Sequence, residues 1–218
     1  MNSQKTSNPF QLTKALLMCG IISSLWYVVI NIYVPLKYEG YSLASFTVSE
    51  LSAIDAPTRK LWVGLVLFYP ILFGAFGFGI LQSERENRTL RTVGVLVVAY
   101  CIFNLYWPPM HMRGQEPTLT DTLHIAWAGV TVLMMMAMMA IASTALGKNF
   151  HIYSIASIAI HIVFGILTST EAPNIPTNGP TPMIGTWERI NVGVFMAWVV
   201  VLALILLARE NNRETHSN

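Results

Sequence analysis

The stretch TLHIAWAGVTVLMMMAMMAIASTAL at residues 122–146 decides the fold class, because it contains no Lys, Arg, Asp or Glu. A helix needs about 20 consecutive, mostly apolar residues to cross a hydrocarbon core of about 30 Å. The only ionisable side chain of this stretch is His124, which lies near its start. The stretch therefore predicts a transmembrane helix.

Similar apolar runs lie on both sides of this one. The six predicted helices cover residues 12–35, 61–82, 90–108, 122–146, 150–169 and 186–208. The first run is too long for the apolar region of a signal peptide, and no small-residue cleavage site ends it, so we expect it to be retained. The connecting loops are too short to hold a soluble domain. The sequence predicts an all-α, polytopic membrane bundle of six transmembrane helices that forms a single domain over residues 1–218.

The composition agrees with a membrane protein. Hydrophobic residues make up 54% of the chain and charged residues only 11%, whereas a soluble domain carries about 25% charged residues. The net charge of +2 and the lack of a basic stripe with aromatics argue against a nucleic-acid partner. Cys19 and Cys101 lie inside apolar runs without a CxxC motif, which favours small buried hydrophobes over a disulfide or a redox pair.

Lysine and arginine indicate the orientation, because they are enriched in cytoplasmic loops. With the N-terminus inside, eight of these residues are cytoplasmic and five lie outside. The cytoplasmic set is Lys5, Lys14, Arg85, Arg88, Arg91, Lys148, Arg209 and Arg213, and the outer set is Lys37, Arg59, Lys60, Arg113 and Arg189. We therefore predict a cell-membrane protein with both termini in the cytoplasm.

The first outer loop, roughly residues 36–60, contains a helix-start signal. Thr47 and Glu50 have the spacing of a capping box, in which each side chain accepts a hydrogen bond from the other residue's backbone N–H. Leu51 and Ile54 follow at helical spacing, and Pro57 ends the run. This pattern predicts a short helix lying at the outer membrane surface.

The second outer loop and the start of the fourth helix carry the richest polar segment, PPMHMRG at 108–114 and TLTDTLH at 118–124. Thr120 is expected to cap the helix with Asp121 in its first turn. Asp121 and His124 share a helical face, so the aspartate could orient the imidazole for metal binding or proton transfer. The alternative is a helix cap beside an interfacial polar residue.

His161 lies deeper, in the fifth helix. An ionisable residue at that depth is a functional candidate by default. The alternative is a helix–helix hydrogen bond, for example to Asn104. We expect His161 to be the more structural of the two histidines and His124 the freer one.

Acids, histidines and arginines gather at the outer loops and the adjoining helix ends of a chain that is otherwise poor in charge. Binding-site candidates are Glu50, Asp55, His111, Arg113, Asp121, His124, Glu171, Glu188 and Arg189, and possible metal ligands are His111, His124 and His161.

Three blocks carry a family resemblance: SELSAIDAPTRKLW at 49–62, MHMRG with TLTDTLHIAWAG within 110–129, and GTWERINVG at 185–193. At these blocks the chain resembles the six-helix prokaryotic membrane proteins catalogued as domain of unknown function 998. The resemblance implies a stand-alone six-helix membrane protein, and it implies no reaction.

Two functions compete on these observations, and a third, a proton- or ion-coupled transporter, is disfavoured because the sequence shows no inverted halves and no charged residue deep in several helices. The first is a binding or scaffold module that contacts membrane lipid or a protein partner. The alternative is a hydrolase or transferase acting on lipid head groups at the outer leaflet with zinc or another divalent metal, since a catalytic zinc site uses three protein ligands and one open position. Against the enzyme, the chain has no HExxH motif. Whether the protein is an enzyme stays open at this point.

Overall fold

The structure, a computed structural model, describes residues 9–217. Lys5, which contributes to the predicted charge asymmetry, lies outside the described residues. Within this range there is no β-strand, which confirms the all-α prediction. The α-helices are α1 (Pro9–Tyr33), α2 (Arg59–Val66), α3 (Phe68–Ser83), α4 (Arg88–Phe103), α5 (Leu119–Ser143), α6 (Lys148–Glu171) and α7 (Ile184–Ser217), and the short 3-10 helices are η1 (Pro35–Lys37), η2 (Ser49–Ser52) and η3 (Ala172–Asn174).

Five segments are long and apolar enough to cross a membrane, as expected of a membrane protein. They are Phe10–Lys37, Arg59–Ser83, Leu119–Ser143, Lys148–Asn174 and Ile184–His216. The predicted span at 90–108 corresponds to α4, which has 16 residues and is shorter than the predicted run. The six-span arrangement therefore stays a prediction.

The second predicted span is broken into α2 and α3 at Leu67. Pro70 explains the break, because it has no N–H to donate to the carbonyl of Val66 and its ring crowds the preceding turn. The indole of Trp26 in α1 donates a hydrogen bond of 2.9 Å to the carbonyl of Leu65, at the end of α2. A neighbouring helix thus supplies a hydrogen bond where the helix is interrupted.

The helices form a ring in which each packs against the next in chain order when α2 and α3 are taken as one interrupted helix. α1 packs on α3, α3 on α4, α4 on α5, α5 on α6, α6 on α7, and α7 returns to α1. This order follows the general tendency of elements that are consecutive in the sequence to lie side by side in space.

Aromatic and methionine side chains fill the centre of the ring. Phe73, Phe195, Trp198 and Met138 are fully buried there. Two glycines let neighbouring helices approach closely: a Cβ on Gly77 would lie 3.1 Å from the carbonyl oxygen of Gly94. The backbones of α3 and α4 can approach this closely only because both positions lack a side chain.

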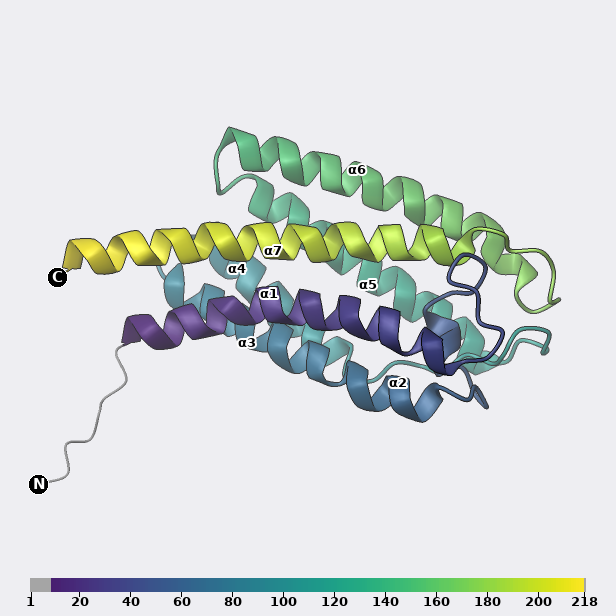
Figure 1. Cartoon of the computed structure of the whole chain (residues 1–218). Coiled ribbons are helices and arrows are strands. Elements are labelled where there is room, and N and C mark those ends of the chain that lie inside the picture. The colour runs from purple at the N-terminus through teal and green to yellow at the C-terminus, as the bar shows by residue number, and fades with distance from the viewer. Residues whose placement is uncertain (1–8, 218) are drawn as a thin grey trace, which may run out of the picture.

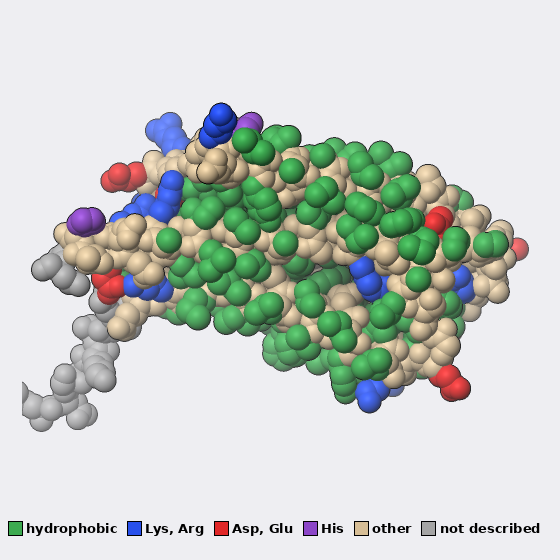
Figure 2. All heavy atoms as spheres, turned by 45° about the horizontal axis from the view of Figure 1, so that its top comes forward, with side chains coloured by type: hydrophobic (Ala, Val, Ile, Leu, Met, Phe, Trp, Pro, Cys, Tyr) green, Lys and Arg blue, Asp and Glu red, His purple; other side chains and the backbone are tan. Residues whose placement is uncertain are grey.

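The ring has two unlike ends. The loop end consists of residues 34–58, 104–118 and 172–183, and the terminal end is where α1 begins, α3 connects to α4, α5 connects to α6, and α7 finishes (Figure 1). Hydrophobic side chains cover the middle of the face shown in Figure 2, and charged side chains lie mainly towards the two ends. This is the distribution expected for a protein whose middle faces lipid.

The predicted short helix in the first outer loop is the 3-10 helix η2. The predicted reciprocal bonds are present: the Thr47 N–H donates to the Glu50 carboxylate at 2.7 Å, and the Glu50 N–H donates to the Thr47 hydroxyl at 3.2 Å. The turn is tighter than an α-helix and only four residues long.

Candidate functional site

Arg113 joins two loops at the loop end through a buried ion pair with Glu50. Its Nε lies 2.7 Å from one carboxylate oxygen of Glu50, and its Nη2 lies 3.0 Å from the other. The Glu50 and Arg113 side chains are 4% and 14% exposed. This two-point pairing fixes both the distance and the orientation of the guanidinium plane.

The same guanidinium reaches the remaining loop. Arg113 donates to the Thr181 hydroxyl at 3.1 Å and to the Ser45 carbonyl at 3.0 Å, and Thr181 itself donates to that carbonyl at 2.8 Å. The guanidinium also lies over the ring of Phe46, 4.0 Å from its centroid. One side chain from the α4–α5 connection therefore contacts both other loops.

The start of α7 holds the first loop by a second set of charged contacts. The Glu188 carboxylate accepts a hydrogen bond from the Val48 N–H. Arg189 donates to the carbonyls of Leu43 and Phe46 and, at 2.6 Å, to the phenol of Tyr41. The loop backbone thus depends on side chains that lie at the beginning of the last helix.

Tyr41 completes this contact from the loop side. Its hydroxyl lies 2.7 Å from the Thr47 carbonyl, to which it donates. Burial raises the pKa of the Tyr41 phenol above its ordinary value, and the charge of Arg189 offsets part of that rise. The phenol therefore keeps its proton and can donate and accept at once.

Gly185 lets the first loop lie directly on α7. Its N–H donates to the Ala44 carbonyl at 2.8 Å. A Cβ at Gly185 would lie 2.1 Å from the carbonyl oxygen of Phe46 and 2.5 Å from that of Leu43, closer than any real contact. The glycine in the GTWERIN block is required by this approach of two backbones.

The Asp121 carboxylate pairs with His111. The sequence had suggested His124 as its partner. The Asp121 carboxylate accepts from the His111 backbone N–H at 2.7 Å and lies 2.8 Å from the His111 Nδ1. It also accepts from the Thr118 N–H at 2.8 Å, so the cap of α5 is Thr118, not Thr120. The chain turns back after α4 and brings His111 to the start of α5, which spacing within one helix could not reveal.

His124 is buried and has its own partners. Its Nδ1 lies 2.7 Å from the Pro108 carbonyl, and its Nε2 lies 3.0 Å from the hydroxyl of Ser49 in η2. The Trp107 indole N–H is also directed at Nδ1, 3.1 Å away, so Nδ1 faces one group that only accepts and one that only donates. The Trp107 ring packs edge-on against it at 5.5 Å. His124 therefore ties η2 to the turn that precedes α5.

His161 makes a helix–helix contact, one of the two predicted alternatives, although its partner is Asn191 and not Asn104. Its Nδ1 lies 2.9 Å from the Asn191 carbonyl, and the Asn191 amide donates to the His161 carbonyl. Among residues 9–217, no group of three His, Cys, Asp or Glu side chains is arranged to hold a metal ion. His111, His124 and His161 each engage a separate partner.

The other predicted candidates lie at the edge of this network. Glu171 accepts from the Met183 N–H at 3.1 Å and so joins the end of α6 to the last loop. Asp55 is exposed at a turn with a φ of 67°, and its carboxylate has no hydrogen-bond partner in the described part of the chain. Sequence reasoning missed Tyr41, Ser45 and Thr181, which are uncharged and stand out only once the loops are placed together.

A family model described as protein of unknown function (DUF998) matches residues 21–205. No curated protein and no solved structure matches the chain.

Proposed function

Since the chain belongs to the DUF998 family of proteins of unknown function, which assigns it no reaction, we infer its role from the loop end. We propose that it is a six-span membrane module whose three locked loops present a rigid surface to a protein partner at the outer side of the membrane. α4 is the sixth span in this arrangement.

The ion pair of Arg113 with Glu50 is the observation that carries this proposal. A buried charge pair costs desolvation energy, and its best-attested use is to specify one arrangement of the surrounding structure. Here it selects one arrangement of three loops, through Ser45 and Thr181. A surface fixed before binding loses less conformational entropy when a partner docks.

In-cell photo-crosslinking tests this function. A photoreactive amino acid at the exposed positions Gln115 or Thr177, both at the loop end, should yield a discrete crosslinked product, and one at Asn149 at the terminal end should not. The substitution R113Q should abolish the product while the protein still accumulates in the membrane. A product that persists in R113Q, or no product from either outer position, would overturn the proposal.

The orientation belongs to the same proposal, with the loop end outside and both termini in the cytoplasm. Seven of the eight Lys and Arg residues assigned to the cytoplasm lie in the described range at the terminal end, which supports this direction. In a C19S/C101S background, a membrane-impermeant thiol reagent should label Gln115→Cys and Thr177→Cys from outside intact cells. Labelling of Glu86→Cys from outside would reverse the orientation.

The pairing of His111 with Asp121 favours one alternative, the hydrolase or transferase acting on lipid head groups. An aspartate bonded to Nδ1 fixes the tautomer and leaves Nε2 able to accept a proton or bind a metal. The His111 side chain is 24% exposed and so can be reached from solvent. For this alternative, H111A should remove lipid-hydrolysing activity of purified protein supplied with zinc, whereas the binding module predicts no such activity in either form.

A further inference from the structure

The terminal end contains a second polar cluster that the function proposed above does not use. Glu84 is 3% exposed and lies 3.2 Å from an Nη of Arg213 and 3.7 Å from one of Arg209. Glu210 lies 3.3 Å from Arg213 and accepts from the Ser83 hydroxyl at 2.8 Å.

Lys14 pairs with Glu214 at the same end. Three of the four acids assigned to this end are thus neutralised by Lys14, Arg209 and Arg213. The remaining acid, Glu86, is exposed.

Three other arginines surround the start of α4 without an acidic partner. Arg85, Arg88 and Arg91 are exposed, and no carboxylate of the described chain lies within ion-pair distance of any of them. Within the described part of the chain, the Arg91 guanidinium donates one hydrogen bond, to the carbonyl of Arg85 at 3.4 Å. Glu84, Glu210 and Glu214 are paired with other residues, and Glu86 lies beyond ion-pair distance of these arginines, so their positive charges are free to meet an anion from outside the chain.

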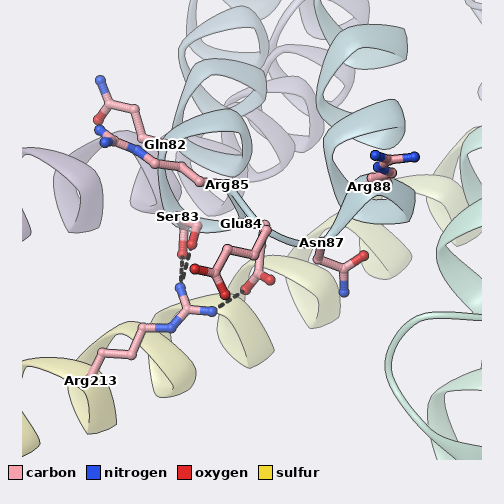
Figure 3. A pocket seen from close by; sticks show the side chains of 8 residues that line it. Gln82, Ser83, Glu84, Arg85, Asn87, Arg88 and Arg213 are labelled. Atoms are coloured by element: carbon pink, nitrogen blue, oxygen red, sulfur yellow. Dashed lines mark hydrogen bonds and ion pairs between the residues drawn. The ribbon is translucent and has the colours of Figure 1, made fainter.

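Two open hollows adjoin these arginines. The first, of about 820 Å³, is lined by the end of α3, the α3–α4 connection with its carboxylates Glu84 and Glu86, the start of α4, and Arg213 (Figure 3). In Figure 3, Arg213 reaches from α7 to Ser83 and Glu84, while Arg85 and Arg88 extend from the connection and from α4 away from that pair. The second hollow, of about 430 Å³, is lined by Arg88, Arg91, Thr92 and Val95. Arg88 lines both hollows.

An apolar stripe continues from the second hollow along α4. Val95 and Ile102 are 56% and 65% exposed, and Ala99 between them is exposed as well. Arg88, Thr92, Val95, Ala99 and Ile102 recur at intervals of three or four residues, so they share one face of the helix. This face therefore carries a positive charge at its Arg88 end and apolar side chains from Val95 to Ile102.

We propose that this face of α4 binds an anionic phospholipid of the cytoplasmic leaflet. Its phosphate-bearing head group sits at Arg88 and Arg91, which line the second hollow, and an acyl chain runs along Val95 and Ile102. Arg85, on the α3–α4 connection, adds positive charge at the same end of the bundle. The guanidinium groups recognise phosphate oxygens by charge-assisted hydrogen bonds. The adjoining apolar stripe distinguishes a lipid from a soluble phosphate, since a free anion makes no contact there. Clusters of basic residues beside a membrane span are a known basis for such recognition.

Lipid-dependent stability of the full-length protein in detergent tests this site. Phosphatidylglycerol should raise the unfolding temperature, whereas phosphatidylcholine, glycerol 3-phosphate and inorganic phosphate should not. The affinity for phosphatidylglycerol should fall as salt is added, because salt screens exposed charges. Native mass spectrometry should show one retained anionic lipid per chain.

The variant R85Q/R88Q/R91Q should lose the stabilisation, with about a hundredfold weaker binding, at roughly fivefold for each arginine. The matched control K37Q/K60Q/K148Q removes the same charge from exposed lysines that line neither hollow, and it should behave as wild type. If the triple arginine variant does not fold, T92E places a negative charge in the second hollow and should also abolish the effect.

Each remaining outcome would overturn the proposal. Equal stabilisation by phosphatidylcholine would show that charge is not recognised. Equal protection by glycerol 3-phosphate or inorganic phosphate would assign the site to a soluble anion. Phosphatidylglycerol binding that survives both T92E and the triple arginine variant would place the lipid elsewhere.

Discussion

The two ends of the bundle use the same residue types for different purposes. At the loop end, Arg113 and Arg189 each make several hydrogen bonds to loops distant in sequence. At the terminal end, Arg85, Arg88 and Arg91 are exposed and have no acidic partner among residues 9–217. An arginine that is buried in a network stabilises structure, and one left unpaired at the membrane boundary is available to a ligand. The role of a charged residue at the end of a membrane protein therefore depends on whether it is buried with hydrogen-bond partners or exposed without them.

The largest effect should come from breaking the buried ion pair at the loop end. R113Q leaves the Glu50 carboxylate buried without its partner, so we expect a loss of about 3–5 kcal/mol in the free energy of unfolding. Unfolding in detergent, followed by tryptophan fluorescence, measures this loss. The double variant E50Q/R113Q should recover part of it, and no recovery would mean that the charge pairing is not the source of the loss.

The next largest effect should come from G185A, which tests how closely the first loop lies on α7. The added Cβ would collide with the carbonyls of Phe46 and Leu43, and such overpacking costs about 1–3 kcal/mol. G193A is the matched control in the same helix, because a Cβ there meets nothing within 4 Å. Equal unfolding temperatures for the two variants would contradict the tight contact.

A smaller difference should separate the two buried histidines. H124A removes a bridge between Pro108 and Ser49 and should cost about 1–3 kcal/mol, the range for a buried polar group left unpaired. H161A removes one hydrogen bond to Asn191 and should cost less. The sequence alone suggests the opposite ranking. Parallel thermal melts decide between the two, and a larger loss in H161A would restore the ranking from sequence.

The smallest effect should be at the terminal end. R213Q should cost less than about 1 kcal/mol, because Arg213 is 45% exposed and Arg209 still faces Glu84 at 3.7 Å. Chemical unfolding of R213Q and R113Q under the same conditions compares the ends directly. A loss in R213Q as large as in R113Q would remove the distinction between a locked end and an open end.

The helices could be predicted from sequence because apolar runs are local signals. The runs at 12–35 and 122–146 coincide closely with α1 and α5. The break at Leu67 could not be predicted in full: Pro70 indicates a kink, but the sequence does not show that Trp26 will donate a hydrogen bond at the interruption.

The sequence predicts which residues take part in the candidate site better than it predicts which residues they contact. A charge-poor chain makes Glu50, Arg113 and Asp121 conspicuous, and all three do take part in contacts between loops or between a loop and a helix. Their partners could not be deduced, because they depend on how loops far apart in sequence cross. His111 reaches Asp121 only through the turn that follows α4.

The short fourth helix has a consequence for the membrane itself. Sixteen residues at about 1.5 Å each give α4 a length of about 24 Å, less than the hydrocarbon thickness of about 30 Å. In the six-span arrangement, the bilayer beside α4 must thin locally, or the residues that flank the helix must extend towards the interface. The bilayer is then thinner on the α4 side of the protein than elsewhere around it. We expect the protein to favour thinner bilayers and to associate with other membrane proteins whose short helices cause the same thinning.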